Sequence, residues 1–262
     1  MIRAGVGGWN FEPWRGTFFP EKLSKAKELS YASRQLTAIE VNGTFYSTFK
    51  PPTFQKWHSE TPDDFVFALK ANRFCVNRRV LAEAGPSIER FIGSGVAELK
   101  QKLGPILWQF MHTKKFDPAD FEAFLALLPK AADGVKLRHV VEPRHESFKT
   151  AEFIALARKY DVAIVYADVK KFPSIPDATS DFVYARLQDS QEDVLTGYTP
   201  AALKKWAEAA KAWAEGGLPK GMEPVGKAAA KKKRDVFMFF IAGAKVRNPA
   251  AAMEFLKIVG KQ

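Results

Sequence analysis

Several short apolar runs along the chain end in residues that can bind anions or move protons. In chain order these residues are Glu40 and Asn42, Lys70, Gln109, Glu142, Arg144 and His145, Asp168, and Arg186. Carboxylates and imidazoles serve as general acids and bases, whereas lysine and arginine pair with carboxylates and phosphates. If the runs are parallel strands, their ends lie at one edge, and we expect these side chains to meet there.

Five of these residues are candidates for catalysis. We predict Glu142 or Glu40 as the general acid or base, and His145 as a proton shuttle. Two carboxylates in differently charged surroundings can hold well separated pKa values, as an acid and its partner base require. Asp168 joins them as a third carboxylate. Lys70 is either an anion-pairing group or, if desolvated near another cation, an amine that forms a Schiff base.

A further set of residues is predicted to bind the substrate. The set consists of Trp9, Trp14, Asn42, Tyr46, Gln109, Arg144 and Arg186. The arginines would clamp an anionic group, and the aromatic rings offer flat faces on which a sugar or a base could stack. The alternative for each tryptophan is that it packs within its loop.

A divalent metal is a further hypothesis for the same region. Imidazole and carboxylate ligands suit zinc or manganese, and the candidate ligands are His145, Glu142, Glu40 and Asp168. These residues follow different apolar runs, and the sequence has no HxxxH or HExxH helix whose spacing would mark a metal site. The cofactor is therefore left open.

Alternation along the strands determines which of these side chains can meet. Residues two apart lie on one face of a strand, which pairs Ala68 with Lys70, Val140 with Glu142, Tyr166 with Asp168, and Tyr184 with Arg186. If those faces point inward, we expect the three carboxylates to pair with Lys70, Arg144 and Arg186, because a buried charge is costly unless it is paired. The alternative is that these residues are salt bridges that only plug the top of a barrel.

The elements that would position this site are eight β-type runs that alternate with helical patterns. The predicted strands are residues 2–8, 37–41, 65–70, 106–110, 137–142, 162–167, 182–187 and 236–242. Predicted helices cover residues 118–128, 151–160, 200–213 and 249–259. Near-continuous apolar strands are typical of parallel sheets covered on both faces. We therefore predict one domain over residues 1–262, an α/β TIM-type (β/α)8-like barrel with mostly parallel strands and long strand-to-helix loops.

Composition is typical of a globular protein with a large core. Of the 262 residues, 47% are hydrophobic. No apolar run approaches the ~20 residues that a membrane span requires. Cys75 is the only cysteine, which excludes an intramolecular disulfide, and the N-terminus lacks the basic and apolar regions of a signal peptide. We expect a cytoplasmic protein that does not engage a membrane.

The net charge of +11 favours anionic partners. Residues 220–234, with the sequence KGMEPVGKAAAKKKR, hold six basic residues and one acid, and so supply nearly half of this excess. Their glycine, proline and alanine content predicts an exposed basic loop. Such a loop is either a solvated insertion or an arm that binds nucleic acid.

The motifs of the chain resemble those of the DUF72 family, also called YecE-like. Two segments carry most of the likeness: GVGGWNFEPWRGTFFP at residues 5–20 and IEVNGTFY at residues 39–46. The further matches, in the order of the family, are FALK at residues 67–70, LGPILWQ at 103–109, VEPRH at 141–145 and DFVYARL at 181–187. The resemblance covers nearly the whole length and implies a TIM-type barrel. It implies no established activity.

The chain departs from the family pattern at the last two strands and after the fourth. Where many relatives have a histidine and glycine two residues after the arginine of strand seven, this chain has Gln188 and Asp189. Ile241 and Ala242 replace two asparagines, and Met111 and His112 stand where relatives often have Pro-Pro after the glutamine of strand four. These departures weaken any mechanism that depends on strands seven and eight.

Three functions follow from these features. The first is an enzyme of hydrolase or lyase type that acts at the barrel mouth on an anionic substrate, such as a phosphorylated or sugar-containing compound. The second is a non-catalytic protein that binds nucleic acid or another polyanion through the basic loop. The third is a metal-assisted phosphoesterase or nuclease, which rests on fold analogy. The oligomeric state is not predicted.

Overall fold

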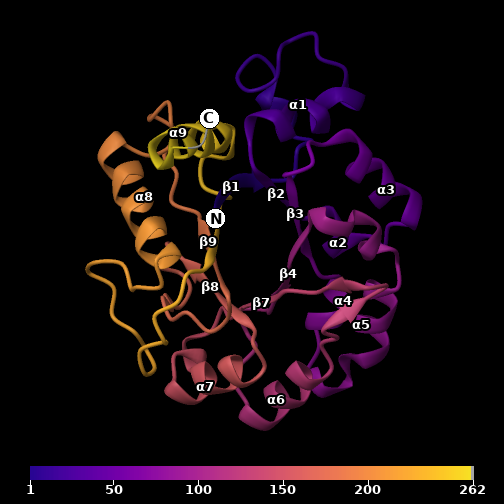
Figure 1. Ribbon diagram of the computed structural model, residues 1–262, viewed down its shortest axis with the longest axis vertical. Helices are drawn as coiled ribbons and strands as arrows, with labels where there is room; N and C mark the ends of the chain where they lie inside the picture. Colours follow the sequence, from indigo (N-terminus) through magenta and orange to yellow (C-terminus); the bar gives the residue numbers. More distant parts are fainter. Residues whose placement is uncertain (261–262) are drawn as a thin grey trace.

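Eight parallel strands close into a barrel in the computed structural model, which describes residues 1–260 (Figure 1). The strands are β1 (Ile2–Gly7), β2 (Ala38–Val41), β3 (Val66–Lys70), β4 (Leu103–Gln109), β7 (His139–Glu142), β8 (Ala163–Ala167), β9 (Phe182–Leu187) and β10 (Asp235–Phe240). Each pairs with the strands before and after it, and β10 closes onto β1. Two short strands, β5 (Ala131–Ala132) and β6 (Val135–Lys136), form a separate antiparallel pair. The predicted barrel and its eight strands are confirmed.

Helices surround the barrel on all sides (Figure 1). They are α1 (Glu28–Gln35), α2 (Gly43–Tyr46), α3 (Pro51–Glu60), α4 (Arg73–Val76), α5 (Gly85–Ile92), α6 (Pro118–Ala126), α7 (Ala151–Lys159), α8 (Pro200–Ala214) and α9 (Asn248–Val259). Three of these helices begin at an N-cap side chain that accepts a hydrogen bond from a backbone N–H group: Asp117 for α6, Thr150 for α7 and Thr199 for α8. These caps fix where each helix begins after its loop. No helix among residues 1–260 is long and apolar enough to cross a membrane.

The inside of the barrel is filled by alternate residues of the strands. The filling cluster is Ala38, Val66, Ala68, Leu107, Val140, Ala163, Val165, Phe182, Tyr184, Phe237 and Phe239. On five strands, the residue two positions further on is polar or charged: Glu40, Lys70, Gln109, Glu142 and Arg186. Alternation therefore places all five inside the barrel at the C-terminal ends of the strands.

Strand β8 has the opposite orientation from the one predicted. Its inward residues are Ala163 and Val165, so Tyr166 points outward. The ring of Tyr166 packs against Trp206 and Trp213 of α8, at 5.9 and 5.3 Å between centroids. The prediction failed here because both faces of a parallel strand are buried, and AIVYA has apolar residues on each face.

Ion pairs close the opposite end of the barrel. Arg138 pairs with Asp235 at 3.0 Å and Asp181 at 3.6 Å, and its guanidinium lies 4.6 Å from the centre of the Phe182 ring. In TIM barrels this end usually contributes stability, and the catalytic groups lie at the other.

Residues 220–234 cross the outside of the barrel between α8 and β10, and their lysines are exposed. Asp177 anchors the segment because its carboxylate accepts from the backbone N–H groups of Val225 and Gly226 at 2.7 and 2.9 Å. Arg234 is buried and donates to three backbone carbonyls. The arginine at the end of the segment is thus structural, and the lysines alone face solvent.

Candidate functional site

Arg186 lies between two glutamates at the C-terminal mouth of the barrel. From β9, its Nε and Nη2 donate to Glu40 on β2 at 3.0 and 3.1 Å. Its Nη1 donates to the two carboxylate oxygens of Glu142 on β7, at 2.8 and 2.9 Å. All three side chains are at most 3% exposed. One buried guanidinium therefore links three strands that are not neighbours in the barrel.

Further polar groups complete this Glu40–Arg186–Glu142 network. Tyr184 donates its hydroxyl proton to Glu40 at 2.7 Å. Gln109 donates to Glu142, and Arg144 donates to the same carboxylate at 3.3 Å. Every oxygen of the two carboxylates thus accepts at least one hydrogen bond.

The network keeps its charges despite burial. Burial alone would raise the pKa of Glu142, but the charges of Arg186 and Arg144 and the hydrogen bond from Gln109 outweigh it and lower the pKa. Burial also works against the charge of Arg186, yet the two carboxylates raise its pKa. Glu142 and Arg186 are therefore charged at neutral pH.

Lys70 is buried beside this network without a polar partner. Its side chain, at the end of β3, makes no ion pair or hydrogen bond within residues 1–260. Its Nζ lies 4.1 Å from the centre of the Phe45 ring. Burial first, and the charge of Arg186 second, lower the pKa of Lys70 from 10.5 to about 8, against the opposing effect of the two glutamates. The amine is therefore partly uncharged slightly above neutral pH.

These contacts differ from the roles that the sequence predicts for Glu40, Glu142 and Arg186. Glu40 and Glu142 are bound to Arg186, so neither carboxylate is free to exchange a proton with a substrate. Arg186 is neutralised from two sides, so it is not a free clamp for an anion. Lys70 and Arg144 are the cations of the mouth that keep bonding capacity, since the buried Nε of Arg144 has no partner among the described residues.

Asp168 lies outside the network, contrary to the prediction that the three carboxylates share one set of ion pairs. One carboxylate oxygen accepts from the backbone N–H of Gln188 at 2.6 Å, and the other accepts from the hydroxyl of Tyr198 at 3.1 Å. The reason is the orientation of β8. Tyr166 points outward to α8, and Asp168, two residues later, follows on the same side. Asp168 ties the loop after β8 to the loop after β9.

The environment of Asp168 predicts a measurable dependence of stability on pH. Burial raises the pKa of Asp168 from 3.8 to about 6, although the hydrogen bonds from Gln188 and Tyr198 act in the opposite direction. The folded protein binds this proton more tightly than the unfolded chain does. The contribution of Asp168 to the free energy of unfolding therefore falls as pH rises from 3.8 to about 6, and it stays constant at higher pH. Relative to the wild type, Asp168→Asn is expected to gain about 1–3 kcal/mol between about pH 4 and about pH 7.

Urea unfolding of both proteins across this pH range measures the gain. The matched control is Glu192→Gln, which changes an exposed carboxylate in the same loop. A stability difference between Asp168→Asn and wild type that does not vary with pH would contradict the assignment.

The side chain of His145 is held by a hydrogen bond from a residue two positions further along the chain. It precedes a 3-10 turn (Glu146–Phe148), and its Nδ1 accepts from the backbone N–H of Ser147 at 3.1 Å. Within residues 1–260 no group of three or more acidic, histidine or cysteine side chains could hold a metal ion. The predicted ligand set of His145, Glu142, Glu40 and Asp168 is therefore not assembled, because Arg186 occupies the glutamates and loop hydrogen bonds occupy the others.

The predicted aromatic residues have three different positions. Trp14 is fully buried, packs edge-on to Phe18 and Phe19, and donates its indole N–H to the carbonyl of Lys245 at 2.9 Å. It is a core residue, as aromatic clusters favour, and cannot meet a substrate. Tyr46 is 66% exposed on α2. Trp9 is half-buried and lies beside the mouth rather than over it.

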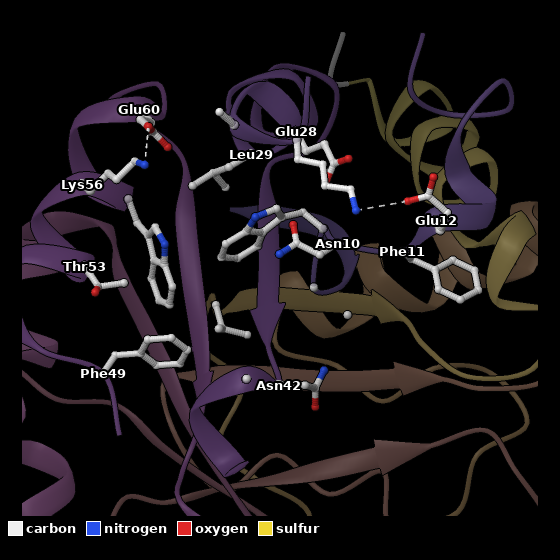
Figure 2. Close-up of a pocket in the computed structure, with 18 of the residues that line it drawn as sticks. Asn10, Phe11, Glu12, Glu28, Leu29, Asn42, Phe49, Thr53, Lys56 and Glu60 are labelled. Carbon is white, nitrogen blue, oxygen red and sulfur yellow. Dashed lines mark ion pairs between the residues drawn. The ribbon is translucent and has the colours of Figure 1, made fainter. Parts of the chain in front are cut away.

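A cavity of about 1060 Å³ lies between α1 and α3, next to the ends of β1 and β2 (Figure 2). We call it the α1–α3 cavity. Trp9 and Asn42 line it, together with Asn10, Thr53 and Trp57. Its lining excludes Lys70 and the Glu40–Arg186–Glu142 network, so this cavity is distinct from the cluster of charges. Sequence reasoning missed Asn10, Thr53 and Trp57, since nothing in the sequence indicates that α1 and α3 are separated by an open space.

The departures at the last strands are accommodated by the structure. Ile241 packs against the apolar filling of the barrel, and the carbonyl of Ala242 accepts from Asn248 at 3.0 Å. The side-chain nitrogen of Gln188 is buried without a partner among residues 1–260.

Comparisons with known proteins agree on one family. The family model described as "Protein of unknown function DUF72" matches residues 3–262. The crystal structure of a DUF72 family protein from Thermotoga maritima MSB8 matches with a TM-score of 0.76 and 22% identity over the full length of both chains. A DUF72 family protein from Enterococcus faecalis V583 matches at a TM-score of 0.72 and 15% identity, over 100% of this chain and 96% of that one.

A curated relative supports the same assignment over a shorter stretch. The UPF0759 protein YunF of Bacillus subtilis (strain 168) is 31% identical over 71 residues, which are 27% of this chain and 24% of that protein. The match thus spans about a quarter of that relative. At these identities the two solved structures bear on the fold alone. The family model, however, extends over almost every residue, and so the chain belongs to the DUF72 family of proteins of unknown function.

Proposed function

We propose that the protein is an enzyme that acts on a small anionic substrate at the C-terminal mouth of its barrel, with Lys70 as the group that contacts the substrate. The observation that carries the proposal is the lack of any partner for the Lys70 ammonium within residues 1–260. Buried charges are normally paired, and an unpaired one is typical of a site that a ligand completes.

The position of Lys70 supports a role toward an anion. Buried polar atoms without partners in the described part of the chain are confined to Arg138, Arg144, Gln188 and Trp213. The Lys70 Nζ also has no partner in this part of the chain, but it is not one of these buried atoms. Solvent therefore reaches it. An anion entering the mouth would meet this ammonium at the end of β3, whereas the unpartnered Nε of Arg144 is buried.

The same geometry favours a lyase over a hydrolase. A hydrolase needs a free carboxylate or imidazole to activate water. Arg186 binds both glutamates of the mouth, and the Nδ1 of His145 accepts from the backbone N–H of Ser147. Lys70 instead has the features of an amine nucleophile: it is 7% exposed, and it lies near Arg186, whose charge favours the neutral amine. Such an amine adds to the carbonyl carbon of a substrate, and loss of water leaves an imine.

Reductive trapping with pyruvate as the probe tests this role. Pyruvate carries a carboxylate and a ketone, and borohydride reduces its imine with a lysine to a stable secondary amine. We expect one added group per chain, located at Lys70 by peptide mass mapping. The yield should rise as pH increases through about 8, because the uncharged amine is the nucleophile.

Two variants separate the reactive amine from simple anion pairing. Lys70→Arg keeps the positive charge and loses the amine, so it should bind pyruvate and inorganic phosphate but form no adduct. Lys70→Met should do neither. Trapping at other lysines with equal yield in Lys70→Arg would contradict the lyase role, and unchanged phosphate and pyruvate binding in Lys70→Met would contradict the anion site itself.

A further inference from the structure

The α1–α3 cavity has a chemistry that the proposed function does not use. We infer that this cavity is a binding site for an uncharged sugar. Small-molecule sites commonly have volumes of about 300–1,000 Å³. A cavity of about 1060 Å³ therefore has room for more than one ring.

Aromatic rings form a corner in the wall of the cavity. Trp9 meets Trp57 edge-on, with 5.2 Å between centroids and an interplanar angle of 86°. Phe49 lines the same cavity and lies at 61° to Trp57, 5.3 Å away. Trp57 is 7% exposed and stacks on Phe67 at 5.9 Å, so the half-buried Trp9 and Phe49 are the rings with more surface open to the cavity. The C–H face of a sugar ring is apolar and can pack on one of these rings while its hydroxyls point elsewhere.

Polar groups in the cavity wall have few hydrogen-bond partners in the described part of the chain. The side chains of Asn10 and Thr53 make no hydrogen bond within the described residues, and the amide of Asn42 has one long contact of 3.5 Å. The indole N–H groups of Trp9 and Trp57 also lack an acceptor, and neither is among the buried unpartnered atoms of residues 1–260. These five groups are free to bond with a ligand, and between them they offer both donors and acceptors.

The arrangement of these groups is visible in the cavity (Figure 2). Thr53 and Phe49 lie on the side of α3, and Asn10 and Asn42 lie across from them on the side of the strands. A ligand between them would therefore meet polar groups on two sides and an aromatic ring on a third.

Charges in the cavity wall are mostly neutralised by one another. Lys25 pairs with Glu12 and Lys56 pairs with Glu60, each at 3.7 Å, and Glu28 pairs with Arg15 at 2.6 Å. The ammonium of Lys245, the remaining cation, lies 4.2 Å from the centre of the Phe11 ring. An uncharged ligand leaves these pairs intact and needs no opposite charge from the wall.

A sugar fits these features better than a planar base. A base gains most when it lies flat against an aromatic ring, and a sandwich requires two parallel faces, but Trp9 and Trp57 are nearly perpendicular. A sugar ring instead has hydroxyls around its whole edge, which suits unpartnered amide, hydroxyl and indole groups on several sides. The site does not depend on Lys70, which is absent from its lining.

Nuclear magnetic resonance of the indole N–H groups tests the inference. The probes are glucose, galactose, N-acetylglucosamine, maltose and cellobiose, titrated into the full chain. We expect at least one of them to shift the indole signals of Trp9 and Trp57, assigned with Trp9→Phe and Trp57→Phe, in a saturable manner. The other indoles, those of Trp14, Trp108, Trp206 and Trp213, serve as internal references.

A double variant and a matched control separate a specific site from nonspecific effects. Asn10→Ala with Thr53→Ala removes two groups that hold nothing within the protein, so the fold should be unchanged. At about 1 kcal/mol for each hydrogen bond, affinity should fall about 20- to 30-fold. Asn77→Ala with Thr113→Ala changes two exposed residues away from the cavity lining and should leave affinity unchanged.

Three results would overturn the inference. They are the absence of any shift with all five sugars, equal affinity in the two double variants, and binding of uridine or adenosine in place of sugars. Lys70→Met should bind the sugar as the wild type does, so failure of this site and failure of the anion site at the mouth can be told apart.

Discussion

Replacing Arg186 with Met is expected to lower the free energy of unfolding at neutral pH by about 3–5 kcal/mol, because removing one member of a buried ion network leaves unpaired charges behind. Glu40 and Glu142 would lose four hydrogen bonds to the guanidinium while remaining at most 1% exposed. Within residues 1–260, Glu40 would then have no ion pair, and Glu142 would keep only the longer one with Arg144 at 3.3 Å. This is the largest effect on stability that we expect from a single change.

The pH dependence of this loss follows from the same geometry. In the wild type the pKa of Glu142 is lowered, so its pairing contributes stability that is lost as pH falls through the folded pKa. In Arg186→Met, Glu142 loses the larger of the two charges that lower its pKa and keeps Arg144 and Gln109, so its pKa rises relative to the wild type. Protonation of Glu142 then costs the variant less as pH falls. The deficit should therefore be largest at neutral pH and shrink in acid, as measured by urea unfolding at several pH values.

A triple variant provides the control. Glu40→Gln and Glu142→Gln, combined with Arg186→Met, remove all three charges and should recover most of the loss, since uncharged groups in the same place cost much less to bury. If the single variant is as stable as the wild type, or if the triple variant is no better than the single one, the network does not hold the mouth together as described.

Replacing Lys70 with Met is expected to have the opposite sign and to raise the free energy of unfolding at neutral pH. A pKa lowered from 10.5 to about 8 means that the folded protein disfavours the charged amine. At 1.36 kcal/mol per unit, that penalty is about 3 kcal/mol, and we expect Lys70→Met to recover about 1–3 kcal/mol of it. The penalty applies in full below about 8 and fades as pH rises toward 10.5, where the unfolded chain loses the same proton.

A second buried lysine gives a matched control. Lys102 is 2% exposed, but its ammonium donates to the carbonyls of His58 and Thr61 at 2.6 and 2.7 Å. Lys102→Met should therefore destabilise the protein, because it leaves both carbonyls without that donor. Urea unfolding of the two variants at neutral and alkaline pH compares a satisfied lysine with an unsatisfied one. Destabilisation by Lys70→Met would contradict the unpartnered state of the amine.

The opposite signs of the two predictions distinguish structure from function at the mouth. Arg186 is paired on every side and contributes to the fold. Lys70 reduces stability and persists at the end of β3, and residues that cost stability are characteristic of functional sites. Substitution of Lys70 should therefore increase stability while abolishing anion binding, a combination that a purely structural lysine would not produce.

Strand positions and much of the mouth could be predicted from the sequence for one reason. Alternate residues of a strand share a face, and the polar ends of β2, β3, β4, β7 and β9 follow apolar residues that fill the barrel. Alternation predicted the inward face correctly on strands where a polar residue ends a series of inward-facing apolar residues. It was wrong at β8, where Tyr166 and Val165 are equally compatible with either face.

The sequence does not show which side chains form hydrogen bonds or ion pairs with one another. Glu40, Glu142 and Arg186 were expected to meet, but whether Arg186 would bind the glutamates or a substrate depends on distances between strands that are far apart in the chain. The same is true of Trp14, which looks like its neighbour Trp9 in sequence yet is enclosed by Phe18 and Phe19. Aromatic residues in long loops give no local signal that separates the two outcomes.

The amino-acid sequence by itself determined the barrel, the number and order of its strands, and the residues that its inward faces bring to the C-terminal end, because alternation and hydrophobicity act over a few neighbouring positions. Only the tertiary structure decided that Lys70 has no partner among residues 1–260, that Asp168 bonds to the loop after β9, and that an open cavity separates α1 from α3. Pairing and empty space arise between segments that are distant in the chain, and no local pattern specifies how closely those segments approach.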